Sequence, residues 1–217
     1  MPVSRTPGHA TGPHSDVLPT RPRPEVDLSD PPESLSEAAV SVLGWRGVAL
    51  PAMTLLGRRV VPVAELVAEA HAERLCLGFG PNTDRTSVAT WTWPEMVGRV
   101  PPPAVRLSGV ISFARHWRTA LGAAAPFARH CGAAMVLPSA VHGIDDYLDN
   151  APGRARRHGV SVLTADDHTL RIDQTAWADT VSPAGSVTGR WLRELVYERL
   201  IAHMVRDVAD RRGCLTD

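Results

Sequence analysis

Apolar and polar positions follow their clearest helical period in the last part of the chain. From Val187 to Val208, apolar residues recur every three or four positions. This spacing predicts a long amphipathic helix over residues 186–212. Its stripe is broader than one edge of a small sheet requires. We therefore expect the helix either to pack centrally or to offer part of its stripe to a protein partner, including a second copy in a homodimer.

Between residues 133 and 164, two apolar runs flank a more polar, helix-forming segment. Strands are predicted at 133–137 and 160–163, with a helix near 144–158 between them. This order favours a βαβ unit near 133–164. Leu170 and Ile172 alternate with polar residues after a turn, which predicts an antiparallel return strand. The predicted fold class is therefore α/β, or α+β, with a mixed β-sheet.

The earlier part of the chain predicts shorter elements. A capped helix is expected from Ser34, a strand over 58–63 and a helix from Val63 to Glu73. A strand over 105–113, with a bulge or bend at Ser108-Gly109, precedes a helix near 117–130.

Residues 75–79 and 87–93 predict a hairpin, because both runs are apolar or rich in Val, Thr and Trp and turn residues separate them. In such a hairpin Trp91 and Trp93 lie on one face of the second strand. There they could stack on bases or sugars, although a core role for at least one is favoured.

Residues 1–37 lack the periodic pattern of the remainder. They are rich in Pro, Gly, Ser and Thr and hold few apolar residues. Such a segment cannot bury enough surface to offset the entropy of ordering, so we predict a disordered Pro-rich tail. Residues 38–217 are then of the right size for a single α/β domain.

Charge gives little support for a nucleic-acid partner. The chain has 23 Arg, no Lys and 23 acidic residues, so its formal net charge is zero. Only a small excess of Arg is left once the acidic tail is set aside, whereas nucleic-acid binding draws its affinity from concentrated positive charge. The absence of Lys excludes Schiff-base chemistry, and it removes the usual lysine of PD-(D/E)xK nucleases. The Arg, Ala and Pro bias suggests a GC-rich, actinobacterial genome.

No apolar run reaches the ~20 residues that a membrane helix needs, so no membrane insertion is expected. The first residues hold no apolar segment typical of a signal peptide, and the three Cys show no CxxC spacing. These features favour a cytoplasmic protein with reduced thiols.

The acidic segment Asp145-Asp146-Tyr147-Leu148-Asp149 is the most suggestive chemical motif. On a helix its three carboxylates share one side and could hold Mg²⁺. This DDxxD spacing resembles the diphosphate-binding motif of prenyl-diphosphate and terpene synthases. Those enzymes are all-helical, however, and the predicted strands on either side contradict that architecture. The alternative is a structural role, in which the acids interact favourably with the positive end of the helix dipole.

Further candidate groups lie before and after the predicted strand at 160–163. Arg154, Arg156 and Arg157 could bind phosphate or could compensate the negative end of the same helix. Asp166 could be a further metal ligand at the carboxyl end of a parallel strand, or part of a simple turn. His142 and His168 are the candidate acid or base groups.

Two functions therefore stay open. The first is an accessory or regulatory binding protein that contacts another protein or nucleic acid and is not an enzyme. The second is a Mg²⁺-dependent enzyme that acts on a phosphate ester or diphosphate through the DDxxD acids and the arginines. The missing catalytic fingerprints favour the first.

Overall fold

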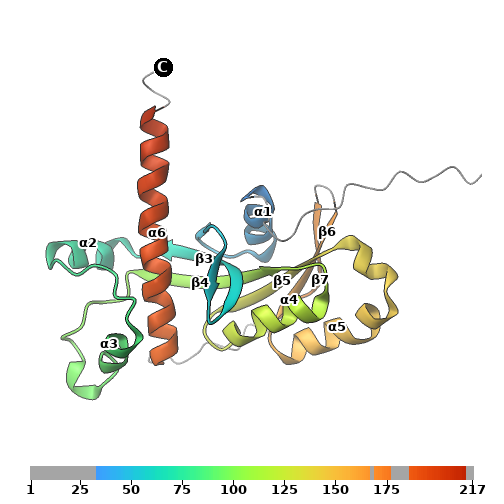
Figure 1. Cartoon of the computed structure of the whole chain (residues 1–217), viewed down its shortest axis with the longest axis horizontal. Coiled ribbons are helices and arrows are strands. Elements are labelled where there is room, and N and C mark those ends of the chain that lie inside the picture. Colours follow the sequence, from blue (N-terminus) through green and yellow to red (C-terminus); the bar gives the residue numbers. More distant parts are fainter. Residues whose placement is uncertain (1–32, 167–168, 177–185, 214–217) are drawn as a thin grey trace, which may run out of the picture.

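The computed structural model describes residues 33–166, 169–176 and 186–213. Seven strands in these residues form one mixed sheet, which Figure 1 shows as a strongly curled layer, like half of a barrel. Its order is β1-β3-β4-β5-β6-β7, with β2 also beside β3. The strands are β1 (Val48–Ala49), β2 (Met53–Leu55), β3 (Arg58–Leu66), β4 (Val105–Phe113), β5 (Gly132–Pro138), β6 (Ser161–Asp166) and β7 (Thr169–Gln174). The predicted mixed α/β class is confirmed.

Six α-helices are described in these ranges, with three short 3₁₀ turns. The helices are α1 (Glu33–Leu43), α2 (Ala68–Cys76), α3 (Arg85–Thr90), α4 (Trp117–Ala124), α5 (Asp145–Arg157) and α6 (Val187–Gly213). The turns are η1 (Pro94–Met96), η2 (Ala125–Phe127) and η3 (Ser139–Gly143). α1 begins at Glu33, so residues 33–37 of the predicted tail are helical. Residues 1–32 lie outside the described part of the chain.

The predicted βαβ unit is confirmed and is one of two in succession. β4 and β5 are parallel and are joined through α4, while β5 and β6 are parallel and are joined through α5. β7 returns antiparallel to β6, as the alternation of Leu170 and Ile172 predicts. The carboxyl ends of β5 and β6, the start of α5 and η3 therefore lie along one edge of the sheet.

The sheet separates two apolar layers. Alternate residues of β5 point to opposite faces, so that Met135 packs with α4 and α5 whereas Val136 packs with α1. A third cluster joins β3 and β4 to the first half of α6, where Leu192 and Val196 are fully buried. Each buried side chain of this size contributes about 1.5–3 kcal/mol. These clusters fix α4, α5 and α6 on the sheet (Figure 1).

The predicted irregularity at Ser108-Gly109 is a β-bulge. Pairing of β4 with β3 passes from Gly109 to Leu107, so Ser108 is the extra residue. The Trp45 ring occupies the space where a Cβ on Gly109 would lie. Glycine is therefore required at this position by the close approach of the ring.

The predicted helix over residues 63–73 is wrong in its first part. β3 continues to Leu66, and α2 begins only at Ala68. Spacings of three and four residues fit a helix, but the backbone of β3 is paired by β1 on one side and by β4 on the other. These hydrogen bonds from distant segments satisfy the backbone N–H and C=O groups of β3. They therefore override the helical spacing of its apolar residues.

The predicted hairpin over 75–79 and 87–93 is also wrong. Leu75 belongs to α2 and is 66 % exposed, and the second segment falls largely in α3. The Asp84 carboxylate starts α3 because it accepts hydrogen bonds from backbone N–H groups of the first turn. The cap outweighs the strand propensity of Val, Thr and Trp.

Trp91 and Trp93 consequently share no strand face. Trp91 follows α3, and its ring lies 5.2 Å from the guanidinium of Arg190 on α6. Trp93 precedes η1 and is 57 % exposed. The alternative of two rings stacked on one strand face therefore does not hold, and the favoured core role is not met either, because Trp91 is only half-buried and Trp93 is exposed.

The helix near 117–130 is shorter than expected, because α4 ends at Ala124 and η2 follows. The helix over 186–212 is confirmed as α6. Within the described ranges every helix is too short or too polar to span a bilayer. Cys76 and Cys131 are free thiols, and Cys214 lies outside the described residues.

Candidate functional site

The three DDxxD aspartates lie in the first turns of α5. Asp145 and Asp149 are exposed, while Asp146 is engaged by α4. The indole N–H of Trp117 donates to one Asp146 oxygen at 2.8 Å, and Arg118 donates to the other at 2.7 Å. Asp146 therefore joins α4 to α5, which is a structural use of this carboxylate.

The geometry adds no support to the magnesium hypothesis. In the part of the chain that the structure describes, no three His, Cys, Asp or Glu side chains are grouped so that they could hold a metal ion. Asp166 ends β6 and is exposed, and His168 lies outside the described residues. Metal binding by Asp145, Asp146, Asp149 and Asp166 thus stays a sequence-based prediction.

His142 pairs with an aspartate that the sequence did not indicate. Its Nε2 lies 2.7 Å from Asp173 Oδ2 on β7, and the Tyr147 hydroxyl donates to the same oxygen at 2.6 Å. Thr164 and Arg171 each donate to Oδ1 at 3.3 Å. One carboxylate thus gathers donors from η3, α5, β6 and β7.

Burial and hydrogen bonding oppose each other at this carboxylate. Asp173 is only 11 % exposed. Burial by itself raises its pKa, but the hydrogen bonds from Tyr147 and His142 outweigh burial and hold the pKa below the ordinary value of 3.8. Burial and the bond to Asp173 raise the pKa of the Tyr147 hydroxyl above its ordinary value. At neutral pH the aspartate is therefore charged and the tyrosine is a neutral donor.

The three predicted phosphate-binding arginines have different surroundings. The Arg154 guanidinium lies 5.8 Å from the centre of the Trp117 ring. Arg156 donates to the Gln174 side chain at 3.5 Å. Arg157 lines a pocket of about 540 Å³ together with Arg129 and His158. The structure thus separates residues that are neighbours in the sequence.

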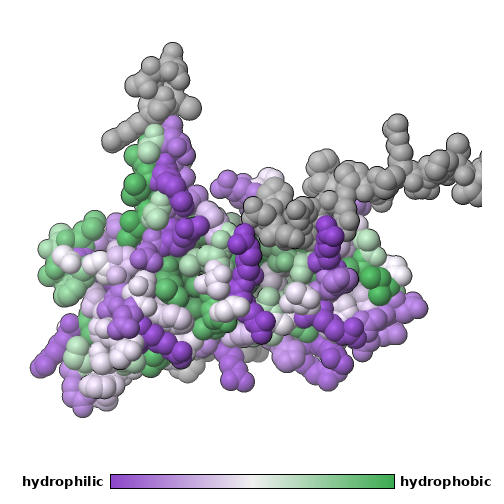
Figure 2. Space-filling view, in the orientation of Figure 1, coloured by the Kyte–Doolittle hydropathy of each residue, from purple (hydrophilic) through white to green (hydrophobic). Residues whose placement is uncertain are grey.

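The apolar stripe of α6 continues beyond the body of the molecule. It is buried where the helix crosses β3 and β4, and it then passes into solvent on the projecting C-terminal half (Figure 1). Met204 is 41 % exposed, Val205 64 % and Val208 50 %. Figure 2 shows this stripe along one side of the projection and more apolar surface over α2.

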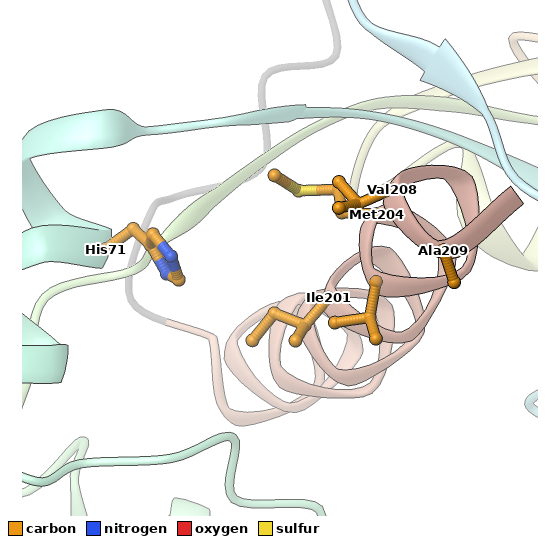
Figure 3. Close-up of a pocket in the computed structure, with 6 residues that line it drawn as sticks. His71, Ile201, Met204, Val208 and Ala209 are labelled. Carbon is orange, nitrogen blue, oxygen red and sulfur yellow. The ribbon is translucent and has the colours of Figure 1, made fainter. Parts of the chain in front are cut away.

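The base of the projection and α2 enclose an apolar pocket. Its volume is about 500 Å³, and Figure 3 shows His71 of α2 facing the helix across it. The other lining residues all come from α6 and are Ile201, Met204, Val205, Val208 and Ala209. We call this set, with His71, the α2–α6 corner. The His71 Nδ1 lies 2.8 Å from the Tyr197 hydroxyl, which ties α2 to α6 at its base.

A buried ion pair holds the corner together. Both oxygens of Glu194 on α6 accept hydrogen bonds from Arg74 on α2, at 2.9 and 2.7 Å. The two side chains are 0 % and 1 % exposed. Arg74 also donates to the Gly80 carbonyl at 2.9 Å. This bidentate pair fixes α2 and the segment after it against α6.

Sequence reasoning missed the α2 side of the corner and the Asp173 network. Arg74 and Glu194 are 120 residues apart, and Asp173 is 31 residues from His142. Neither pair has a local sequence signal. Comparisons of the chain with protein-family models, with curated proteins and with solved structures found no match.

Proposed function

We propose that this protein is an accessory protein that acts by binding other proteins, and that its projecting helix pairs with a second copy of the chain. The observation that carries the proposal is the apolar stripe of Met204, Val205 and Val208. These three side chains lie beyond the body of the molecule and are 41–64 % exposed. A projecting amphipathic helix is stabilised when its apolar side is covered. The exposed stripe therefore calls for a partner surface of the same kind.

The spacing of the stripe fits an antiparallel second copy. Ile201, Met204, Val205 and Val208 are separated by three, one and three positions, and this order is the same from either end. A two-fold axis between Met204 and Val205 would set Ile201 of each copy against Val208 of the other. Such a two-fold interface uses one self-complementary patch on both chains.

Charge does not oppose this pairing. The formal net charge of the chain is zero. The polar side of the projection carries both signs, in Arg206, Asp207 and Asp210. Two copies can therefore approach without strong net repulsion.

The test is a charge-swap experiment at Val205, which lies beside the proposed axis. Sedimentation equilibrium should find the parent chain dimeric. Val205→Arg and Val205→Glu should each be monomeric, with dissociation constants raised about a hundredfold or more because like charges would face each other. An equimolar mixture of the two variants should recover a dimer.

The matched control is Leu148→Arg, which changes a 54 % exposed leucine on α5, far from the stripe. It should leave the parent's association unchanged. A parent chain that is monomeric at all concentrations would overturn the proposal. The stripe would then bind a different protein. A dimer that survives Val205→Arg would move the interface elsewhere.

A further inference from the structure

We propose that the pocket of Arg129, Arg157 and His158 binds a phosphate group, either free phosphate or the phosphate of a small phosphomonoester. The pocket has a volume of about 540 Å³ and lies where α5 ends and where η2 leads into β5. Volumes of ~300–1,000 Å³ are typical of small-ligand sites. This site is independent of the projecting helix.

The lining explains which side chains can meet a ligand. Its walls are otherwise made of small residues, namely Gly122, Ala125, Pro126, Ala128 and Gly159. A Cβ on Gly122 would touch nothing within 4 Å, so the space there is open. Arg129, Arg157 and His158 are therefore the lining residues that offer hydrogen-bond donors to a ligand, and all three are exposed to solvent.

The charge of the pocket has one sign. None of its lining residues is acidic. Residues 114–159 contain six Arg, three Asp and no Glu. The three Asp lie in the first turns of α5, and Asp149 is about 12 Å along the helix from Arg157. No carboxylate of this segment therefore competes with a bound anion at the pocket.

Helix-dipole compensation accounts for only part of this arrangement. Cations suit the C-terminal end of α5, where Arg157 and His158 lie. Its last carbonyls already accept hydrogen bonds from the backbone N–H groups of His158, Gly159 and Val160. Arg129 comes from a different element and yet lines the same pocket. Convergence from two elements points to a ligand.

The positive charge beside the pocket also affects a neighbouring histidine. Burial lowers the pKa of His130, and the charges of Arg193 and Arg129 lower it further. Among the described residues, neither Arg129 nor Arg157 has a hydrogen-bonded or ion-paired partner. Arginine matches the oxygens of phosphate through its planar fork, and two of them complement a dianion.

The experiment is calorimetric titration of the full chain with inorganic phosphate and with adenosine monophosphate, against sodium chloride of equal ionic strength. We expect saturable binding of phosphate groups by the parent chain. Arg129→Gln and Arg157→Gln should each weaken binding about tenfold or more, because each removes a charge-assisted contact. Equal affinity for the two probes would identify free phosphate as sufficient, whereas tighter nucleotide binding would identify a phosphomonoester.

The matched control is Arg154→Gln, the same change one turn earlier on α5 but outside the pocket. It should leave the affinity unchanged. The proposal is overturned if neither probe binds above the salt control, or if Arg154→Gln weakens binding as much as Arg157→Gln does. Circular dichroism melts establish that each variant is folded.

Discussion

At the scale of single residues, Asp173 shows how one buried carboxylate can organise several elements. Its oxygens accept hydrogen bonds from Tyr147 at 2.6 Å and from Thr164 at 3.3 Å, and His142 lies within 2.7 Å. The charge stays on the aspartate because these donors outweigh burial. The network therefore ties η3 and α5 to the edge formed by β6 and β7.

This network predicts a pH dependence of stability. The pKa of Asp173 is lower in the folded chain than its ordinary value of 3.8. The stabilisation of the folded state by the Asp173 carboxylate is therefore fully present above about pH 4. It is lost as the pH falls through the pKa that Asp173 has in the folded chain. Asp173→Asn should lower the free energy of unfolding by about 1–3 kcal/mol at neutral pH, and its deficit relative to the parent should shrink in acid.

Urea unfolding of both proteins over a pH series measures this deficit. Tyr147→Phe is the companion variant, since it removes one donor and keeps the ring. The loss of that donor should raise the Asp173 pKa towards its ordinary value, so the acid loss of stability should be smaller than in the parent and complete at a higher pH. A deficit for Asp173→Asn that is constant from neutral to acid pH would contradict the assignment.

At the scale of elements, the contact between α2 and α6 depends on the Arg74–Glu194 pair. Both charges are buried, and Glu194 also pairs with Arg190 of α6 at 3.4 Å. The Arg74 guanidinium also lies 4.7 Å from the centre of the Tyr197 ring. This pair positions α2, which forms one wall of the α2–α6 corner.

Breaking this pair should be costly. Glu194→Gln removes the counter-charge of Arg74 and also that of Arg190, whose guanidinium lies 3.4 Å from Glu194, and should lower the free energy of unfolding by about 3–5 kcal/mol. The double variant Arg74→Met with Glu194→Leu should lose less than the sum of its single changes. The exposed Arg106–Glu65 pair, also 2.7 Å apart, provides the control.

Glu65→Gln should cost less than about 1 kcal/mol, because solvent screens that pair. Denaturant unfolding of Glu194→Gln, Glu65→Gln, the double variant and its two single changes gives all the required free energies. Equal losses at the buried and exposed pairs would show that α6 does not depend on the ion pair.

At the scale of the whole molecule, a curled sheet carries helices on both faces and a helix that extends past its edge (Figure 1). The two proposed sites lie on different parts of this frame. The stripe belongs to α6, whereas the phosphate pocket lies where α5 ends and η2 leads into β5. Binding at one site can thus be tested without disturbing the other.

Dimerisation predicts that thermal stability depends on protein concentration. Association of folded chains stabilises them by mass action, so Tm should rise by about 1–3 °C for each tenfold increase in concentration. Scanning calorimetry over a wide concentration range measures the rise. Val205→Arg should have a Tm that is independent of concentration. The same rise in the variant and in the parent would assign it to another interface.

The local pattern predicted much of the frame correctly. The second βαβ unit, the β7 return, the Ser108 bulge and α6 all follow from spacing and turn residues. It failed at 63–66 and in the 75–93 segment. In the first case strand pairing from distant segments overrode the helical period, and in the second the Asp84 cap outweighed strand propensity and started a helix.

The candidate sites were predicted less well than the frame. The motif of Asp145, Asp146 and Asp149 suggested a metal site, but Asp146 is engaged by Trp117 and Arg118 of α4. His142 was predicted as an acid or base group, and the structure pairs it with Asp173, which the sequence did not indicate. Such pairings depend on which elements become neighbours, and local spacing does not specify this.

By itself, the sequence determined the mixed α/β class and the apolar stripe of α6, because side-chain periodicity is a property of neighbouring residues. Only the tertiary structure decided that this stripe leaves the body after Leu200, and that Arg157, unlike Arg154, meets Arg129 at a pocket. The physical reason is that burial and charge convergence arise from packing between distant segments.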